Sequence, residues 1–269
     1  MQVIRLKRSG IRNNRSFVRP NSANSIRGIR FFKKMSGSFN IATNKKNNIR
    51  DFNINLVVLS EEGKMTAAYD LAADPVEFMN KNVVIVHGLN PRESNWQNTT
   101  NFSLLDSASA FGMALPCTRK SGLITKTAGL YSLQSYNNHP STLVTAYWCG
   151  YQDDSVKYQM LSNQVSLFFT HRMDGCTFGV GSPTPTGDVL VAHINIQLNG
   201  RTDQKIMRDS AKVMLGDNCK LLEKSRYMKN QAMALTTTFG VRKNNRWKFY
   251  HQRYRSNGNG YELIDVRSV

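Results

Sequence analysis

One cysteine and one histidine, Cys176 and His193, are the pair whose types and spacing best suit chemistry. The segment between them, Gly181-Ser-Pro-Thr-Pro-Thr-Gly187, is rich in turn-forming residues. If its flanks pair as a hairpin centred between Thr184 and Pro185 without a bulge, Cys176 falls directly opposite His193. Such residues share a face of the sheet, with Cβ atoms about 4.5–5.5 Å apart. The sequence therefore predicts a thiol within hydrogen-bonding reach of an imidazole.

This arrangement is typical of attack on an amide carbonyl. A thiolate is the nucleophile, a free cysteine ionises only near pKa of about 8.5, and an imidazole can take the proton and return it to a leaving amine or ammonia. Gly175 leaves room beside the sulfur, and backbone N–H groups around Gly175 and Thr177 are candidate oxyanion donors. The hydroxyl of Thr170 is a candidate for orienting the ring. The alternative interpretation is that Cys176 is a small buried hydrophobe.

The surrounding pattern predicts the elements that position these residues. In 189–198 the apolar side chains alternate, so that Val191, His193 and Asn195 share the face opposite Ala192 and Ile194. We expect strands over 53–59, 83–86, 141–148, 165–169, 177–180 and 189–198, and a hairpin of 236–241 with 246–250. We expect helices over 67–80, from an N-cap at Thr202 to Gly216, and over about 220–233. The predicted fold class is α+β, an antiparallel β-sandwich core flanked by helices.

Charge separates the chain into two parts. Residues 1–50 contain 13 of the 36 basic residues and no acidic residue, and the first carboxylate is Asp51. Residues 51–269 therefore hold 23 basic and 18 acidic residues, a net charge of +5. We interpret 1–50 as a basic arm without a stable fold and 51–269 as the cysteine–histidine catalytic domain. An acid-free start rich in Arg and Ser is also the composition of a mitochondrial transit peptide.

Other classes of site have no support in the sequence. The four cysteines lack C-x-x-C spacing, which argues against a zinc knuckle or redox motif, and we expect no metal and no cofactor. No apolar run approaches the length of about 18 residues that a membrane span needs. Val86-His87-Gly88 is similar to the oxyanion segment of lipases, but the sequence has no G-x-S-x-G elbow for the nucleophile. An ADP-ribosyltransferase would need an E-x-E or Q-x-E pair, whereas Glu262 has no such neighbour. His251 is expected on a solvated basic hairpin, 246–255.

The residues around the dyad resemble a known family. Phe168-Phe-Thr170, four further residues, Gly175-Cys176, then a turn and Val191-Ala-His193-Ile are similar to the catalytic core of Burkholderia lethal factor and the cytotoxic necrotizing factors. The resemblance covers about 30 of the 269 residues. Met173-Asp174 replace the Leu-Ser of the family's Leu-Ser-Gly-Cys motif, and the turn is longer than in the lethal factor.

The resemblance implies a β-sandwich toxin or secreted effector that deamidates a glutamine of a host protein. It assigns the nucleophile to Cys176, the general base and acid to His193, and the ring-orienting hydroxyl to Thr170. The implied substrate is a small GTPase or translation factor in the host cytoplasm, reached after secretion or translocation with a possible delivery complex. Transamidation and amide-bond proteolysis would use the same groups.

A structural protein is the rival interpretation. A basic arm ahead of a β-rich body is typical of a capsid subunit that packages nucleic acid, which would bind in a salt-dependent manner without sequence preference. Loss of ammonia release in Cys176→Ser would favour the enzyme, whereas nucleic acid lost on deleting 1–50 would favour the capsid.

Overall fold

The computed structural model describes residues 66–86, 99–135, 139–228 and 234–269, all within one compact unit of residues 48–269. The predicted arm 1–50, the predicted strand 53–59 and the boundary between the two predicted domains lie outside the described residues. The described part is β-rich with few helices. None of its helices is long and apolar enough to cross a membrane.

Most strands belong to one ten-stranded sheet. In spatial order these strands are β1 (Asn82–Val86), β5 (Gly129–Ser135), β2 (Thr99–Asp106), β6 (Leu143–Cys149), β8 (Leu167–Thr170), β14 (Leu235–Lys243), β15 (Arg246–Ser256), β16 (Tyr261–Ser268), β3 (Cys117–Ser121) and β4 (Ile124–Thr127). Neighbours pair antiparallel except β1 with β5, β6 with β8 and β16 with β3. The sheet is thus mainly antiparallel, as predicted, but it contains three parallel pairs that were not predicted.

A second sheet of four strands carries the predicted hairpin. Its order is β13 (Lys220–Leu222), β9 (Thr177–Val180), β10 (Val189–Asn195) and β7 (Ser155–Leu161). A short ribbon of β11 (Gln197–Leu198) and β12 (Arg201–Thr202) follows β10. The helices are α1 (Ala67–Ala73), α2 (Pro75–Lys81), α3 (Ser107–Phe111), α4 (Gln204–Leu215) and α5 (Lys224–Tyr227), with a 3₁₀ turn η1 (Pro140–Thr142).

The two sheets share an apolar core, which is consistent with a sandwich. Phe168 and Phe249 from the large sheet pack with Phe178 from the small one, at ring-centroid distances of 5.7 and 5.8 Å to Phe178. Val191 is fully buried in the same cluster. The alternation predicted for β10 therefore directs Val191 and His193 between the sheets.

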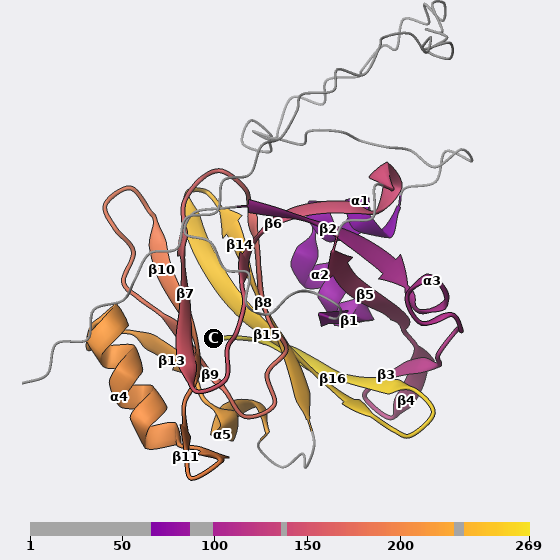
Figure 1. Ribbon diagram of the computed structural model, residues 1–269. Helices are drawn as coiled ribbons and strands as arrows, with labels where there is room; N and C mark the ends of the chain where they lie inside the picture. Colours follow the sequence, from indigo (N-terminus) through magenta and orange to yellow (C-terminus); the bar gives the residue numbers. More distant parts are fainter. Residues whose placement is uncertain (1–65, 87–98, 136–138, 229–233) are drawn as a thin grey trace, which may run out of the picture. The chain divides into compact units, whose positions relative to one another are not determined.

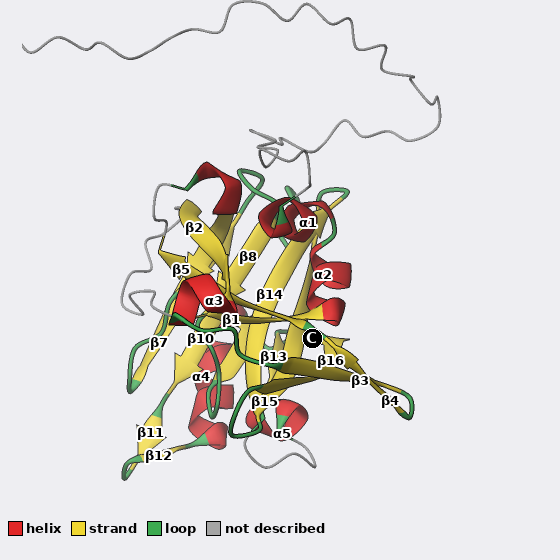
Figure 2. Ribbon diagram, turned by 90° about the vertical axis from the view of Figure 1, so that its right-hand side faces the viewer, coloured by secondary structure: helices red, strands yellow, loops and turns green. Residues whose placement is uncertain are grey.

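Helices cover the outer faces of both sheets. α4 packs on β9 and β10, where Met207 and Ala211 contact the cluster that contains Ala192 and Ile194 (Figure 1). α1 and α2 pack on the large sheet, with Leu71 of α1 in the cluster of Phe169 and Phe239 (Figure 2). Because each strand alternates between two covered faces, aromatic side chains appear at successive positions such as 168 and 169.

Gln252 joins strands that are far apart in the order of the large sheet. Its fully buried side chain donates to the carbonyls of Met79, at 2.6 Å, and Asn82, at 2.7 Å, and accepts from the Val84 N–H at 2.9 Å. The Thr237 hydroxyl also donates to the Val84 carbonyl. The edge strand β1 is therefore held against β14 and β15, which fixes the curl of a sheet too wide to stay open and flat.

The predicted helix 67–80 is two helices. Asp74 ends α1 because its backbone leaves the helical conformation, with φ of −142° and ψ of 83°. It also caps α2, since its carboxylate accepts from the Glu77 N–H at 3.0 Å. Pro75 then takes the first helical position, where its missing N–H costs nothing.

The predicted helix after Thr202 is confirmed with a shifted start. Asp203, not Thr202, is the N-cap of α4, and its side chain accepts from the Ile206 N–H at 2.9 Å. Thr202 instead pairs with Gln197 in the β11–β12 ribbon.

The predicted helix 220–233 is wrong. Residues 220–222 form β13, with Leu222 facing the inter-sheet core and Leu221 facing α4, and only α5 is helical. Pairing with β9 buries Leu222 fully and Leu221 partly, which outweighs the helical propensity of the segment. Residues 229–233 lie outside the described part.

The predicted strands mostly shift at their ends. β6 begins at Leu143 because 140–142 form η1, β8 begins at Leu167, and β10 ends at Asn195 before the ribbon. The hairpin of β14 and β15 is confirmed, with a tight turn at Asn244 and Asn245, both at positive φ.

Candidate active site

The observed register differs from the predicted one by two residues. His193 lies opposite Phe178, and Val191 opposite Val180, so the hairpin centre falls between Pro185 and Thr186. A shift of two keeps the parity of the strand, so Cys176 still faces the inter-sheet core and is a diagonal neighbour of His193. The prediction of direct opposition is wrong, and in the part of the chain that the structure describes no hydrogen bond joins the Cys176 thiol to the His193 ring, contrary to the expected contact. The shared face is observed.

The His193 ring is oriented by Thr170, as the sequence suggested. Thr170 Oγ1 lies 2.8 Å from His193 Nδ1 and donates to the Cys149 carbonyl at 2.7 Å. A hydroxyl has one proton, so Nδ1 must be the donor in the contact with Thr170. Nε2 is then unprotonated and carries a lone pair. Within the described ranges, Nε2 has no hydrogen-bond partner.

Pairing of β6 with β8 explains how Thr170 comes to this position. Cys149 and Thr170 are partners at the ends of these parallel strands. Both are fully buried, and Cys149 packs in the inter-sheet core. The fixed contact to the Cys149 backbone therefore presets the Thr170 hydroxyl as an acceptor for the ring.

Both members of the dyad are neutral in this arrangement. Burial, and then nearby His171, lowers the pKa of His193 to about 3. Burial, followed by the negative charges of Asp174 and Asp153, raises the pKa of the Cys176 thiol to about 12. Both shifts oppose transfer of the thiol proton to the ring. The resting pair is therefore a thiol and a free base, not a thiolate–imidazolium pair.

The candidate oxyanion donors occupy different surroundings. The backbone N–H groups of Cys176 and Gly175 lie near the sulfur and lower the pKa of the thiol. A Cβ at Gly175 would lie 3.3 Å from the Thr202 side chain, so this glycine allows close packing of the β12 segment. Thr177 is paired with Ile194 in the β9–β10 ladder, and its side chain lies on the α4 face of the sheet. The backbone N–H groups of Gly175 and Cys176 are therefore the candidate donors that lie beside the sulfur.

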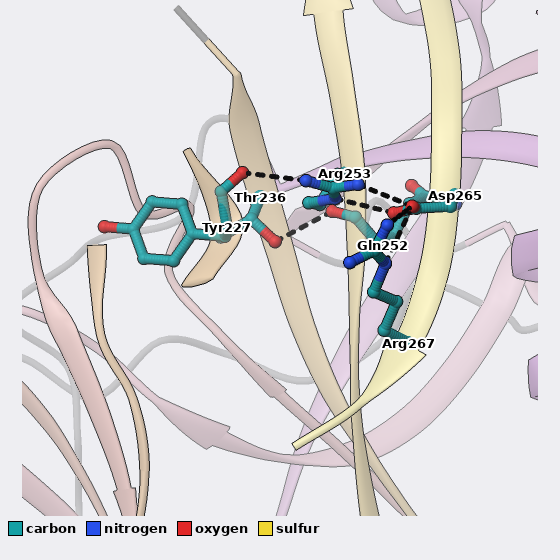
Figure 3. Close-up of polar contacts among 6 residues, drawn as sticks. All are labelled: Tyr227, Thr236, Gln252, Arg253, Asp265 and Arg267. Carbon is teal, nitrogen blue, oxygen red and sulfur yellow. Dashed lines mark hydrogen bonds and ion pairs between the residues drawn. The ribbon is translucent and has the colours of Figure 1, made fainter. Parts of the chain in front are cut away.

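A buried network holds the Cys176 backbone. The Tyr227 hydroxyl donates to the Cys176 carbonyl at 2.9 Å. The Tyr227 carbonyl faces Arg253, whose guanidinium forms two hydrogen bonds with Asp265, at 2.6 and 2.5 Å (Figure 3). The Arg253 side chain is 5% exposed and that of Asp265 27%, so this pair is partly desolvated. The role of Tyr227 was not predicted, because its contact depends on α5, which the sequence pattern placed within a longer helix.

Two aromatic rings lie beside the dyad. The half-buried Tyr151 has its ring centroid 5.8 Å from that of His193 and 4.4 Å from that of His171. Both come from loops that follow strands, β6 and β8. Cys176 is only 5% exposed and His193 1% exposed. Access of a substrate to the sulfur therefore requires movement of these loop residues. No sequence signal marked Tyr151.

His251 was expected in solvent and is buried instead. It is 1% exposed on β15, and burial together with Arg226 and Arg253 lowers its pKa to about 4. It lies opposite Thr238 on the face that carries Phe249. Neither ring nitrogen has a hydrogen-bond partner in the described part of the chain. The basic composition of the hairpin concealed this position: Arg246 and Lys248 do lie on the other face, but Arg253 shares the face of His251 and is itself buried.

Among the described residues, no group of three or more His, Cys, Asp or Glu side chains is placed to hold a metal ion. A scan against protein-family models found no match to the chain, and a search of the curated proteins found none either.

Proposed function

We propose that this chain is a cysteine hydrolase that deamidates a glutamine side chain of another protein. The observation that carries the proposal is the fixed tautomer of His193, which leaves the Nε2 lone pair unpartnered on the face shared with Cys176. A general base needs an unprotonated nitrogen, and the pKa of about 3 keeps the ring in that form at neutral pH.

The first half of the reaction forms a thioester. As the sulfur of Cys176 bonds to the glutamine carbonyl carbon, the thiol proton passes to Nε2 of His193 and the carbonyl electrons move onto oxygen. The backbone N–H of Gly175 is the candidate donor to that oxyanion. Cleavage of the C–N bond restores the carbonyl, and the imidazolium gives its proton to nitrogen, so ammonia leaves.

The second half restores the enzyme. Water gives a proton to Nε2 as its oxygen attacks the thioester carbon. The C–S bond then breaks, the sulfur recovers the proton, and glutamate remains on the substrate. An amine in place of water gives transamidation through the same steps.

Substrate binding has to activate the pair. Cys176 precedes the first residue of β9, so the ladder does not fix its side chain. A bound substrate amide that displaces Tyr151 would let the Cys176 thiol approach Nε2 of His193. Backbone N–H donors shielded from water would then stabilise the negative charge that develops on the substrate carbonyl oxygen. The resemblance to the lethal factor and cytotoxic necrotizing factors supports a host small GTPase or translation factor as the target, met after secretion or translocation.

Intact-mass spectrometry tests the proposal. Purified small GTPases and translation factors are incubated with the chain, and deamidation adds about 1 Da with release of one ammonia per site. Cys176→Ser and His193→Ala should abolish the change. The matched controls are Cys219→Ser and His139→Ala, which alter a half-buried thiol and an exposed imidazole elsewhere. Ammonia release that persists in Cys176→Ser would exclude this nucleophile.

Packaging of nucleic acid is the second candidate, favoured by the 13 cations and no acidic residue in 1–50. It predicts assembly and bound nucleic acid that both disappear on deleting 1–50, with no effect of Cys176→Ser.

A further inference from the structure

A groove opens between the two sheets at the end of β9 opposite to Cys176. Its volume is about 970 Å³. One wall is the β9–β10 loop, Gly181–Gly187, and the other is the β14–β15 turn with Asn244 and Asn245. This volume lies near the upper end of the range of about 300–1,000 Å³ for ligand pockets.

The floor of the groove is apolar and its rim is cationic. Val180, Val189, Trp247 and Phe249 line it and belong to the inter-sheet core. The exposed cations Lys220, Arg246 and Lys248 also line it, and no aspartate or glutamate does. None of the three cations forms an ion pair within the described part of the chain. Their charges are therefore available to a partner.

The walls are preorganised. The Thr184 N–H donates to the Asp188 carbonyl at 2.8 Å, and the Asp188 carboxylate accepts from the Thr186 hydroxyl at 2.9 Å. At Gly187, with φ of +83°, a Cβ would lie 2.5 Å from the Asn245 carbonyl oxygen, so the two walls touch there. A site that is already formed loses little conformational entropy when a ligand binds.

We propose that this groove docks an extended acidic segment of the target protein, with apolar side chains inserted between the sheets. The inference rests on the proposed function and names a recognition surface for it. Acidic side chains would meet the three cations while apolar side chains contact the floor. Nucleic acid fits less well, because a stacked base needs a whole open ring face. An aliphatic side chain needs only the small apolar area that Trp247 and Phe249, 9% and 8% exposed, leave uncovered.

Fluorescence anisotropy tests docking separately from turnover. The protein carries Cys176→Ala, and the probe is a labelled peptide of alternating Glu and Leu. Reversal of Lys220, Arg246 and Lys248 to Glu should weaken binding at least about tenfold. The matched control reverses three exposed cations elsewhere, Lys120, Lys126 and Lys205, and should leave the affinity within about twofold.

Four results would overturn the docking proposal. The control reversals could weaken peptide binding as much as the groove reversals, or a peptide with Lys in place of Glu, or one with Ser in place of Leu, could bind as tightly as the original peptide. A single-stranded oligonucleotide could also bind more tightly than the peptide and compete with it. Failure of the proposed function has a different signature, which is intact peptide docking with no ammonia release by the unmodified chain. If the unmodified chain neither binds the peptide nor releases ammonia, the docking proposal is rejected together with the proposed function.

Discussion

The hydroxyl of Tyr227 donates to the backbone carbonyl of Cys176, 2.9 Å away, and so connects α5 to the residue just before β9. The same tyrosine, through its own carbonyl, meets Arg253 and hence Asp265. The position of the candidate nucleophile therefore depends on a partly desolvated ion pair on β15 and β16, two strands that do not carry the dyad.

Tyr227→Phe should lower both stability and turnover. It leaves a buried carbonyl without its donor, which costs about 1–3 kcal/mol in the free energy of unfolding. Urea denaturation measures that cost, and ammonia release measures turnover. Tyr261→Phe, on a half-buried tyrosine of β16, is the control and should change neither by a comparable amount. An unchanged free energy for Tyr227→Phe would contradict the contact.

Thr170→Val should release the tautomer of His193, whereas Thr170→Ser should keep it. Valine matches threonine in shape but offers no acceptor for Nδ1–H, so we expect roughly a 10²-fold loss of turnover. Nitrogen NMR of the imidazole supplies a readout independent of activity. A ring that stays protonated at Nδ1 in the valine variant would show that Thr170 does not select the tautomer.

Cys176 should alkylate slowly in the resting protein. Its pKa of about 12 and its low exposure leave almost no thiolate at neutral pH. Iodoacetamide should modify the half-buried Cys219 first, and peptide mapping over time distinguishes the two sites. Rapid labelling of Cys176 that persists down to pH 6 would instead indicate a preformed ion pair with His193.

Stability should fall on acidification because two histidines are buried as neutral rings. The pKa values of His193 and His251 drop from 6.5 to about 3 and about 4 on folding. The unfolded chain therefore binds more protons between these values and 6.5, so stability is full above pH 6.5 and is lost as the pH falls below it. Each ring contributes a slope of up to about 1.4 kcal/mol per pH unit.

Urea denaturation from pH 7.5 to 4.5 measures this slope. His251→Gln should remove the contribution of one ring, up to about 1.4 kcal/mol per pH unit, from the slope of the unfolding free energy against pH. His139→Gln, at an exposed site, should leave this slope unchanged. A slope unaltered in His251→Gln would show that this ring does not titrate differently in the two states.

The sequence predicted the strands and faces around the dyad better than their register. Alternation placed Val191 and His193 on one face of their strand, which is the face between the sheets. The hydroxyl contact of Thr170 was anticipated from its type and strand. The two-residue shift of the hairpin was not predictable, because hydrogen bonds within residues 184–188 set the turn. Likewise Leu221 and Leu222 form a strand only because β9 offers an edge to pair with. Whether the dyad is catalytic stays a prediction.

The contacts of Gln252 have a consequence for how the chain acquires its structure. They link β15 to residues about 170 positions earlier, with separations of 168 to β1 and 173 to α2. During synthesis on a ribosome, β1 can pair with β5 early, but the Gln252 side chain that ties β1 to β15 is made much later. Contacts so distant in sequence slow folding and expose unpaired edges meanwhile.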